Sequence, residues 1–187
     1  MPTFLGAHEI PLDYRPRRDD YVRLVVEEML PAVQAQGVAR FCDVFCEPGV
    51  FGIDETEVIL QAVGRHGLRA KLHADELDPA GGAELAARLG AASADHLGAI
   101  STRGIEALAA SGTVAALLPG TLTFLGKPRM APARALVDAG AIVALATDFN
   151  PGSSPTGNLP LILALAVSQS RLQPEEAFVA ATANASS

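Results

Sequence analysis

Residues 142–154, Ile-Val-Ala-Leu-Ala-Thr-Asp-Phe-Asn-Pro-Gly-Ser-Ser, decide the fold class. Residues 142–146 are all apolar, which predicts a central parallel strand of an α/β protein with both of its faces covered. That strand ends on Thr147 and Asp148, and a polar turn rich in proline, glycine and serine follows. A carboxylate at the carboxyl end of such a strand lies where α/β barrel enzymes carry their chemistry. Asp148 is therefore the first candidate for a site residue.

The rest of the chain alternates between apolar strand-like stretches and helical patterns. Further strands are predicted at 3–7, 38–47, 69–75, 93–97 and 114–118. Helices are predicted at 19–36, 54–65, 78–89, 101–111, 132–138, 160–168 and 174–183. Strict β-then-α alternation indicates a parallel sheet of six strands with right-handed crossovers.

Helix-end signals place the boundaries of several helices. Pro31 lies inside a helical pattern, so a kink or a break is expected there. Asp54 with Glu57 three residues later has the form of a capping box. Asp78-Pro79 has the form of a cap followed by a first-turn proline, which predicts another helix start.

Two α/β architectures satisfy this alternation: an open doubly wound sheet and part of a (β/α)8 barrel. A dinucleotide-binding fold would carry a glycine fingerprint after its first strand, but Gly6-Ala7-His8 is no G-x-G-x-x-G. No P-loop lysine motif occurs either. We therefore expect a partial TIM-like (β/α)8 barrel, with residues 1–187 forming one incomplete barrel domain.

Composition limits the class of partner. The 14 basic and 21 acidic residues give a net charge of −7, and the chain has two lysines, Lys71 and Lys127. We expect neither nucleic acid nor a membrane as a partner, because both are anionic surfaces. The absence of a long apolar run or a signal peptide predicts a cytoplasmic protein. Cys42 and Cys46 are expected to be two small buried residues in a reducing compartment.

Candidate site residues collect at the predicted carboxyl ends of strands. His8, His73, His96 and Asp148 all lie there, and in a barrel these ends converge on one face. Imidazole nitrogens with a carboxylate form a ligand set for a catalytic zinc or non-haem iron, which makes bound water acidic. Glu76, three residues beyond His73, is suited to general acid or base catalysis.

Each of these residues also has a structural interpretation. His66 precedes a glycine at a helix end, where a structural role is expected. His8 fits a core histidine as well as a substrate ligand, and His73 or Asp148 alone fits a buried hydrogen-bonding role equally well. Their coincidence at one end of separate strands favours a site. Further acidic residues could contribute but cannot be ranked: Asp13, Asp43, Glu47, Asp75 and Asp95.

Several blocks of the sequence resemble one family. They are Thr3-Phe-Leu-Gly-Ala-His8, Asp43-Val-Phe-Cys-Glu47, Leu72-His-Ala-Asp-Glu-Leu77, Gly81-Gly-Ala-Glu-Leu-Ala86, Ser93-Ala-Asp-His-Leu97, Leu118-Pro-Gly-Thr121 and Ala146-Thr-Asp-Phe-Asn-Pro-Gly-Ser-Ser-Pro155. Together they are similar to the imidazolonepropionase family of the metal-dependent amidohydrolase superfamily, over essentially the whole chain. The resemblance implies hydrolysis of 4-imidazolone-5-propanoate to N-formimidoyl-L-glutamate, in histidine degradation.

The resemblance also implies roles for individual residues. His73 and Asp148 match ligands of one zinc or iron ion. Glu76 matches a proton-transfer residue that also contacts substrate, and His96 a residue that polarises the carbonyl. His8 and Ser153 match residues that contact the substrate. Asn150 and Gly152 match residues that contact the product-like formimidoyl-glutamate. A homodimer is also implied.

The sequence departs from the family in what it lacks. No His-x-His pair, which the superfamily places after its first barrel strand, occurs in the chain. The first two barrel strands and a small β-rich domain have no counterpart. We therefore expect an internal fragment of a longer enzyme, weak in metal binding and inactive alone. Two other hypotheses stay open: a related amidohydrolase or deaminase acting on another cyclic amide or amidine, and a non-catalytic partial-barrel remnant.

Overall fold

The computed structural model describes residues 1–186 and contains one six-stranded parallel sheet. The strands are β1 (Thr3–Ala7), β2 (Phe41–Cys46), β3 (Arg69–Ala74), β4 (Ser93–His96), β5 (Val114–Leu117) and β6 (Val143–Leu145). Each strand pairs with the next strand in the sequence, always in parallel. The prediction of six parallel strands is confirmed.

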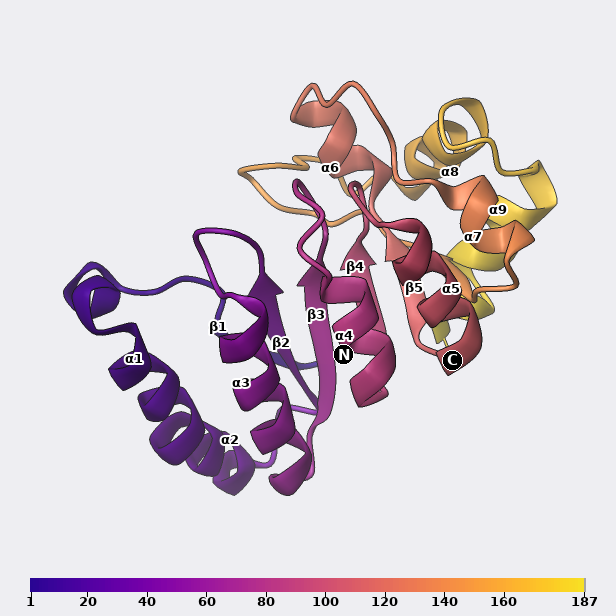
Figure 1. The fold of residues 1–187 in the computed structure, drawn as a ribbon. Helices are drawn as coiled ribbons and strands as arrows, with labels where there is room; N and C mark the ends of the chain where they lie inside the picture. Colours follow the sequence, from indigo (N-terminus) through magenta and orange to yellow (C-terminus); the bar gives the residue numbers. More distant parts are fainter. Residues whose placement is uncertain (187) are drawn as a thin grey trace.

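Helices separate consecutive strands and cover one face of the sheet. They are α1 (Arg18–Leu24), α2 (Leu30–Gln36), α3 (Ile53–Arg65), α4 (Gly82–Leu89), α5 (Thr102–Ser111), α6 (Pro119–Phe124), α7 (Ala133–Asp138), α8 (Leu159–Ser168) and α9 (Pro174–Ala181). Helices α3, α4 and α5 lie together in front of the strands (Figure 1). Sequential strand order with crossovers of one hand puts successive helices on the same side, as in a barrel wall.

The two faces of the strands differ in chemistry because successive side chains alternate. Cys42, Val44 and Leu72 are fully buried in the hydrophobic core that the helices cover. Asp43 lies on the opposite face of β2 and is paired in register with Lys71 of β3. This second face carries polar side chains, and its amino-terminal half is hollowed by a cavity of about 370 Å³. The polar face is the one that would line the interior of a closed barrel.

The apolar stretch at 142–146 forms a shorter strand than expected. Strand β6 covers only Val143–Leu145 and pairs with β5 alone, so the prediction of a central strand is wrong for this chain. Ile142, immediately before β6, is 41% exposed. Strand β2 is also shorter than predicted, starting at Phe41, and Val38 before it is exposed.

Three helix boundaries show where local signals fail. The break expected at Pro31 does not occur: a π-helical segment at Val25–Met29 joins α1 to α2, and the helix runs on through Pro31 to Gln36. The prediction of a capping box at Asp54 and Glu57 is wrong. Helix α3 starts at Ile53, one residue before the predicted start, and the side chain of Glu55 accepts the N–H of Gly52. Helix α4 starts at Gly82 rather than at Asp78-Pro79.

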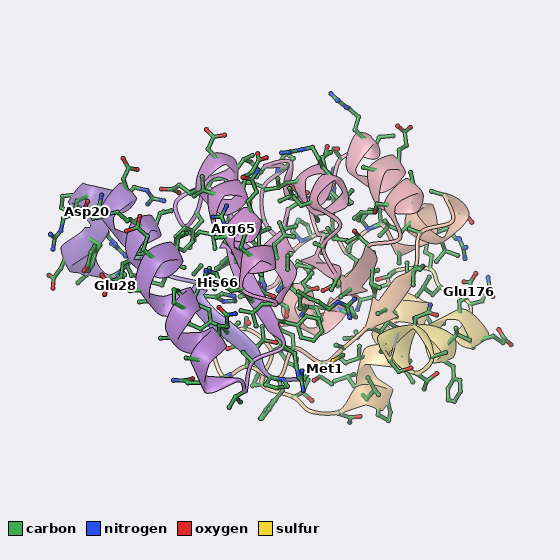
Figure 2. All side chains as sticks on the ribbon, turned by 90° about the horizontal axis from the view of Figure 1, so that it is seen from below. Met1, Asp20, Glu28, Arg65, His66 and Glu176 are labelled. Atoms are coloured by element: carbon green, nitrogen blue, oxygen red, sulfur yellow. The ribbon has the colours of Figure 1, made fainter. Side chains whose placement is uncertain are left out.

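Two further features agree with the sequence-based expectations. Cys42 and Cys46 are free and buried. His66 caps the end of α3, where Nδ1 lies 2.8 Å from Oε1 of Gln34 (Figure 2). Helix α6, in contrast, was not expected after Pro119-Gly120. Within residues 1–186, no helix has both the length and the apolar character needed to cross a membrane.

Candidate active site

Three histidines from three different strands meet at the carboxyl end of the sheet. The ring centroids of His8 and His73 are 4.7 Å apart, and those of His73 and His96 are 4.8 Å apart. His8 follows β1, His73 lies near the end of β3, and His96 is the last residue of β4. The structure therefore brings together the three histidines that were predicted to converge.

Asp43 joins two of these histidines through one carboxylate oxygen. Its Oδ1 atom accepts hydrogen bonds from Nδ1 of His73 at 2.8 Å and from Nε2 of His8 at 3.1 Å. Burial opposes ionisation of Asp43, but the two histidines outweigh it and hold the pKa of this carboxyl well below its usual range. Because Nδ1 of His73 donates to Asp43, Nε2 of His73 keeps its lone pair for another partner.

Lys71 and Asp95 extend this buried polar network. Nζ of Lys71 lies 2.9 Å from Oδ2 of Asp95 and 3.8 Å from Oδ2 of Asp43. Burial lowers the pKa of Lys71, but the neighbouring carboxylates of Asp95 and Asp43 outweigh that effect and raise it overall. The ammonium group of Lys71 therefore balances the negative charge that Asp43 brings into the sheet.

Glu76 lies next to His96 without a hydrogen bond between them. Oε1 of Glu76 is 3.6 Å from Nδ1 of His96, and this buried nitrogen has no hydrogen-bond partner among residues 1–186. Burial and the neighbouring His73 lower the pKa of His96 to about 3, so its ring is neutral at physiological pH. Burial raises the pKa of Glu76. A carboxyl group of raised pKa beside a neutral imidazole suits proton transfer.

Asp148 approaches the site from the loop after β6. Its Oδ2 atom accepts a hydrogen bond from Oγ1 of Thr121, at 2.5 Å, and its charge raises the pKa of Glu76. Asp148 is half-buried and has a φ of 49°. The structure thus places Asp148 on the same side of the sheet as Glu76, with Thr121 of α6 fixing one of its oxygens.

The turn after Asp148 is held by its own hydrogen bonds. The backbones of Asn150 and Ser154 exchange two hydrogen bonds of 3.0 Å, and Oδ1 of Asn150 accepts the N–H of Gly152 at 2.8 Å. Ser153 lies in the same turn. Among residues 1–186, no hydrogen bond or ion pair joins this turn to the histidine cluster.

Backbone strain is concentrated in the loops that carry the site. Among residues 1–186, five non-glycine residues have positive φ, and four of them lie at or after the carboxyl ends of strands: Asp75, His96, Leu97 and Asp148. Non-glycine residues rarely adopt a positive φ, and such backbone strain is typical of functional sites. At His96 the unusual φ of 78° occurs in the residue whose ring lies beside His73.

A group of donors in this cluster is close enough to hold a metal ion. One ligand atom each from His8, Asp43 and His73 all lie within 4.8 Å of one another. His73 belongs both to this set and to the predicted ligand pair of His73 and Asp148. The other two members of the set, His8 and Asp43, were not predicted as ligands, and Asp148 does not belong to the set. Imidazole and carboxylate donors suit a divalent metal, so the donor chemistry fits one.

Several other residues around this cluster have no role predicted from the sequence. Asp43, Glu47 and Asp95 are among the acidic residues that could not be ranked, and Lys71 and Thr121 had no assigned role. Asp43 in mid-strand is the signal that could have been used, because an acid in an otherwise apolar strand needs a buried partner. A cavity of about 520 Å³ adjoins Glu76, with Lys127 and Arg129 in its wall.

Solved structures with the same architecture define the class of this fold. The chain superimposes on guanine deaminase from C. acetobutylicum with a TM-score of 0.72, at 15% identity, covering 98% of this chain and 50% of that one. It matches an atrazine chlorohydrolase variant from Arthrobacter aurescens, solved with zinc, with a TM-score of 0.69, at 19% identity over 86% of this chain and 42% of that one. The chain therefore has the fold of part of a (β/α)8 barrel, as predicted.

Relatives in sequence show which named proteins this chain is similar to. The chain is 54% identical to the imidazolonepropionase of Geobacillus thermodenitrificans over 99% of its length, and 54% identical to that of Bacteroides fragilis over 98%. The chain is therefore homologous to imidazolonepropionases, and the resemblance seen in the sequence is confirmed. It spans 43% and 44% of the length of these two relatives. No protein-family model matches the chain.

Proposed function

We propose that the complete protein that contains this chain is an imidazolonepropionase. It hydrolyses the ring of 4-imidazolone-5-propanoate to give N-formimidoyl-L-glutamate, a step of histidine degradation. The observation that carries the proposal is the convergence of His8, His73 and His96 at the carboxyl end of the sheet, in a chain about half identical to imidazolonepropionases. A cytoplasmic homodimer acting on a small-molecule substrate belongs to the same proposal.

His73 and Asp148 are proposed to supply ligands for one metal ion, zinc or iron. The hydrogen bond from Nδ1 of His73 to Asp43 supports this assignment, because it directs the free Nε2 away from Asp43. An ion held here would act as a Lewis acid and lower the pKa of water, so that water could attack at neutral pH. Asp43 fixes the tautomer and orientation of both His73 and His8.

Glu76 and His96 are proposed to move protons and polarise the scissile amide. Burial raises the pKa of Glu76, which makes its carboxylate a stronger base than an exposed one; it can take a proton from water and then return that proton to the leaving nitrogen. His96 is neutral, and its ring can donate one hydrogen bond to the carbonyl oxygen that gains charge. The buried Nδ1 of His96, which lacks a partner, is available for substrate or for Glu76.

The substrate's two ends are proposed to contact different elements. His8 and Glu76 face the reacting ring. Asn150, Gly152 and Ser153 offer amide, backbone and hydroxyl groups to the end that bears the carboxylate. Since Oδ1 of Asn150 already accepts the Gly152 N–H, the side-chain amide of Asn150 and the hydroxyl of Ser153 are the groups left to donate.

The test is a hydrolysis assay on the complete protein. We expect loss of imidazolone absorbance that requires metal and depends strongly on the propanoate carboxylate, with an analogue lacking that carboxylate as the matched control substrate. Guanine and other cyclic amides or amidines serve as competing substrates. Equal turnover of the analogue, or turnover of another ring with no loss of imidazolone, would overturn the proposal in favour of a different amidohydrolase.

A further inference from the structure

A buried carboxylate that has no role in the chemistry lies directly behind Glu76. Glu47 follows the last residue of β2 and is 4% exposed. Its Oε1 atom accepts hydrogen bonds from the backbone N–H groups of Glu76 and of Leu77, the latter at 3.2 Å. One oxygen of Glu47 therefore connects the end of β2 to two successive amides of the loop that carries Glu76.

The same loop is fixed from its other side. Asp75 accepts hydrogen bonds from four backbone amides, those of residues 80–83, and its own carbonyl accepts the N–H of Ala99 at 2.7 Å. Gly98 packs so closely that a Cβ atom there would lie 2.5 Å from the carbonyl oxygen of Glu76. The backbone of Glu76 is thus held between Glu47 on one side and the start of the loop after β4 on the other.

This arrangement determines where the carboxylate of Glu76 can reach. Oε1 of Glu76 lies 3.6 Å from Nδ1 of His96, a separation that a small rotation of the loop would change. Asp75 has a φ of 48°, so the backbone immediately before Glu76 is in a region that needs support from its surroundings. The contacts from Glu47 provide that support at the two amides that follow.

We propose that Glu47 is a positioning residue, which holds Glu76 in reach of His96 and of the reacting ring. The proposal rests on the proposed function for the role of Glu76 in proton transfer. Glu47 itself touches neither substrate nor His96, and it acts through the backbone of residues 76 and 77. Displacement of a catalytic group by about 1 Å can lower turnover on the order of 100-fold, which sets the size of the expected effect.

The test compares Glu47→Ala, Glu47→Gln and the matched control Glu57→Gln in the complete protein. Glu57 is a carboxylate of α3 that pairs with Arg88 at the surface, away from the loop. We expect Glu47→Ala to lower kcat by about 100-fold with KM changed less than about threefold. Glu47→Gln keeps an oxygen that accepts both amides, so it should restore kcat to within about tenfold of the parent protein. Glu57→Gln should leave kcat unchanged.

A second readout is independent of activity. Amide hydrogen exchange at residues 76 and 77 should become faster by about tenfold or more in Glu47→Ala, and should stay slow in Glu47→Gln. Unchanged exchange in Glu47→Ala, or a kcat that falls equally in the alanine and glutamine variants, would overturn the positioning role. If the parent protein has no imidazolonepropionase activity, the proposed function fails, and the exchange result still decides whether Glu47 holds the loop.

Discussion

Oδ1 of Asp43 lies 2.8 Å from Nδ1 of His73, so a buried carboxylate of β2 sets the orientation of a proposed metal ligand on β3. The two strands are adjacent and in register, with Phe45 opposite His73. A carboxylate that accepts a hydrogen bond from a metal-ligating histidine fixes the tautomer of that histidine and raises the basicity of the ring nitrogen that faces the metal. The role of Asp43 can therefore be tested by mutation, as can the role of the proposed metal ligand His73.

Replacing Asp43 with asparagine should weaken metal binding without removing a proposed ligand. The amide keeps the size of the side chain but loses the charge that the two histidines share. We expect the affinity for zinc to fall on the order of 10- to 100-fold in the complete protein, measured by competition with a chelator. Glu9→Gln, an exposed carboxylate beside Arg15, serves as the control and should leave affinity unchanged. Unaltered affinity in Asp43→Asn would mean that His73 does not bind the metal through Nε2.

The sequence marks Asp43 as an acid within an apolar strand but does not show which side chains it contacts, whereas the positions of the histidines could be predicted. His8 follows β1, His73 is the last residue but one of β3 and His96 ends β4. Parallel strands bring such ends together for purely topological reasons. Asp43 acts through side-chain distances between β2 and β3, and these depend on a register that no local pattern encodes.

Contacts between different elements, which no local pattern encodes, also explain the positions of two helix starts. Asp78-Pro79 is a correct local cap signal, but Asp75 accepts the amides of residues 80–83 and so moves the start of α4 to Gly82. At α3, Glu55 takes the capping role at Gly52, because Glu57 pairs with Arg88 of α4. Contacts between elements override the local pattern in both places.

Substituting Glu76 with glutamine should remove proton transfer. The amide matches the carboxylate in shape but cannot carry a proton between water and the leaving nitrogen. We expect kcat to fall by about 100- to 10,000-fold with a small change in KM, measured by imidazolone loss in the complete protein. A variant that retains more than a tenth of the parent kcat would show that another group transfers the proton.

Glu76 should also affect stability in a pH-dependent way. Burial raises its pKa in the folded state above the ordinary value of 4.5, so the folded state favours the neutral form. Below about pH 4.5 Glu76 is protonated in both the folded and the unfolded state, so it does not lower the free energy of unfolding. As the pH rises through 4.5, Glu76 ionises first in the unfolded state, and the free energy of unfolding falls. This fall ends once the pH passes the pKa of Glu76 in the folded state.

Thermal melts of the parent protein and Glu76→Gln at several pH values check this sign. The variant should melt higher than the parent at pH 7 to 8, and the difference should shrink towards zero near pH 4. A difference of the same size at all pH values would show that packing, rather than ionisation, is responsible.

The two cysteines should be unreactive in the folded chain. Burial raises the pKa of Cys42 to about 12 and that of Cys46 to about 11, so neither forms a thiolate at pH 8. We expect no labelling by a thiol reagent such as Ellman's reagent at pH 8, and two thiols per chain once denaturant is added. Rapid labelling of either thiol without denaturant would contradict the burial of β2 against its helices.

The most direct test measures metal content and imidazolone loss side by side, in the complete protein and in residues 1–187 alone. We expect about one metal ion per complete chain together with metal-dependent turnover. We expect weak metal binding and essentially no turnover for residues 1–187, which contain no His-x-His pair and leave β1 and β6 as open sheet edges. Metal bound one to one with normal turnover by residues 1–187 would be the opposite result, as would a complete protein that binds metal but leaves the imidazolone intact.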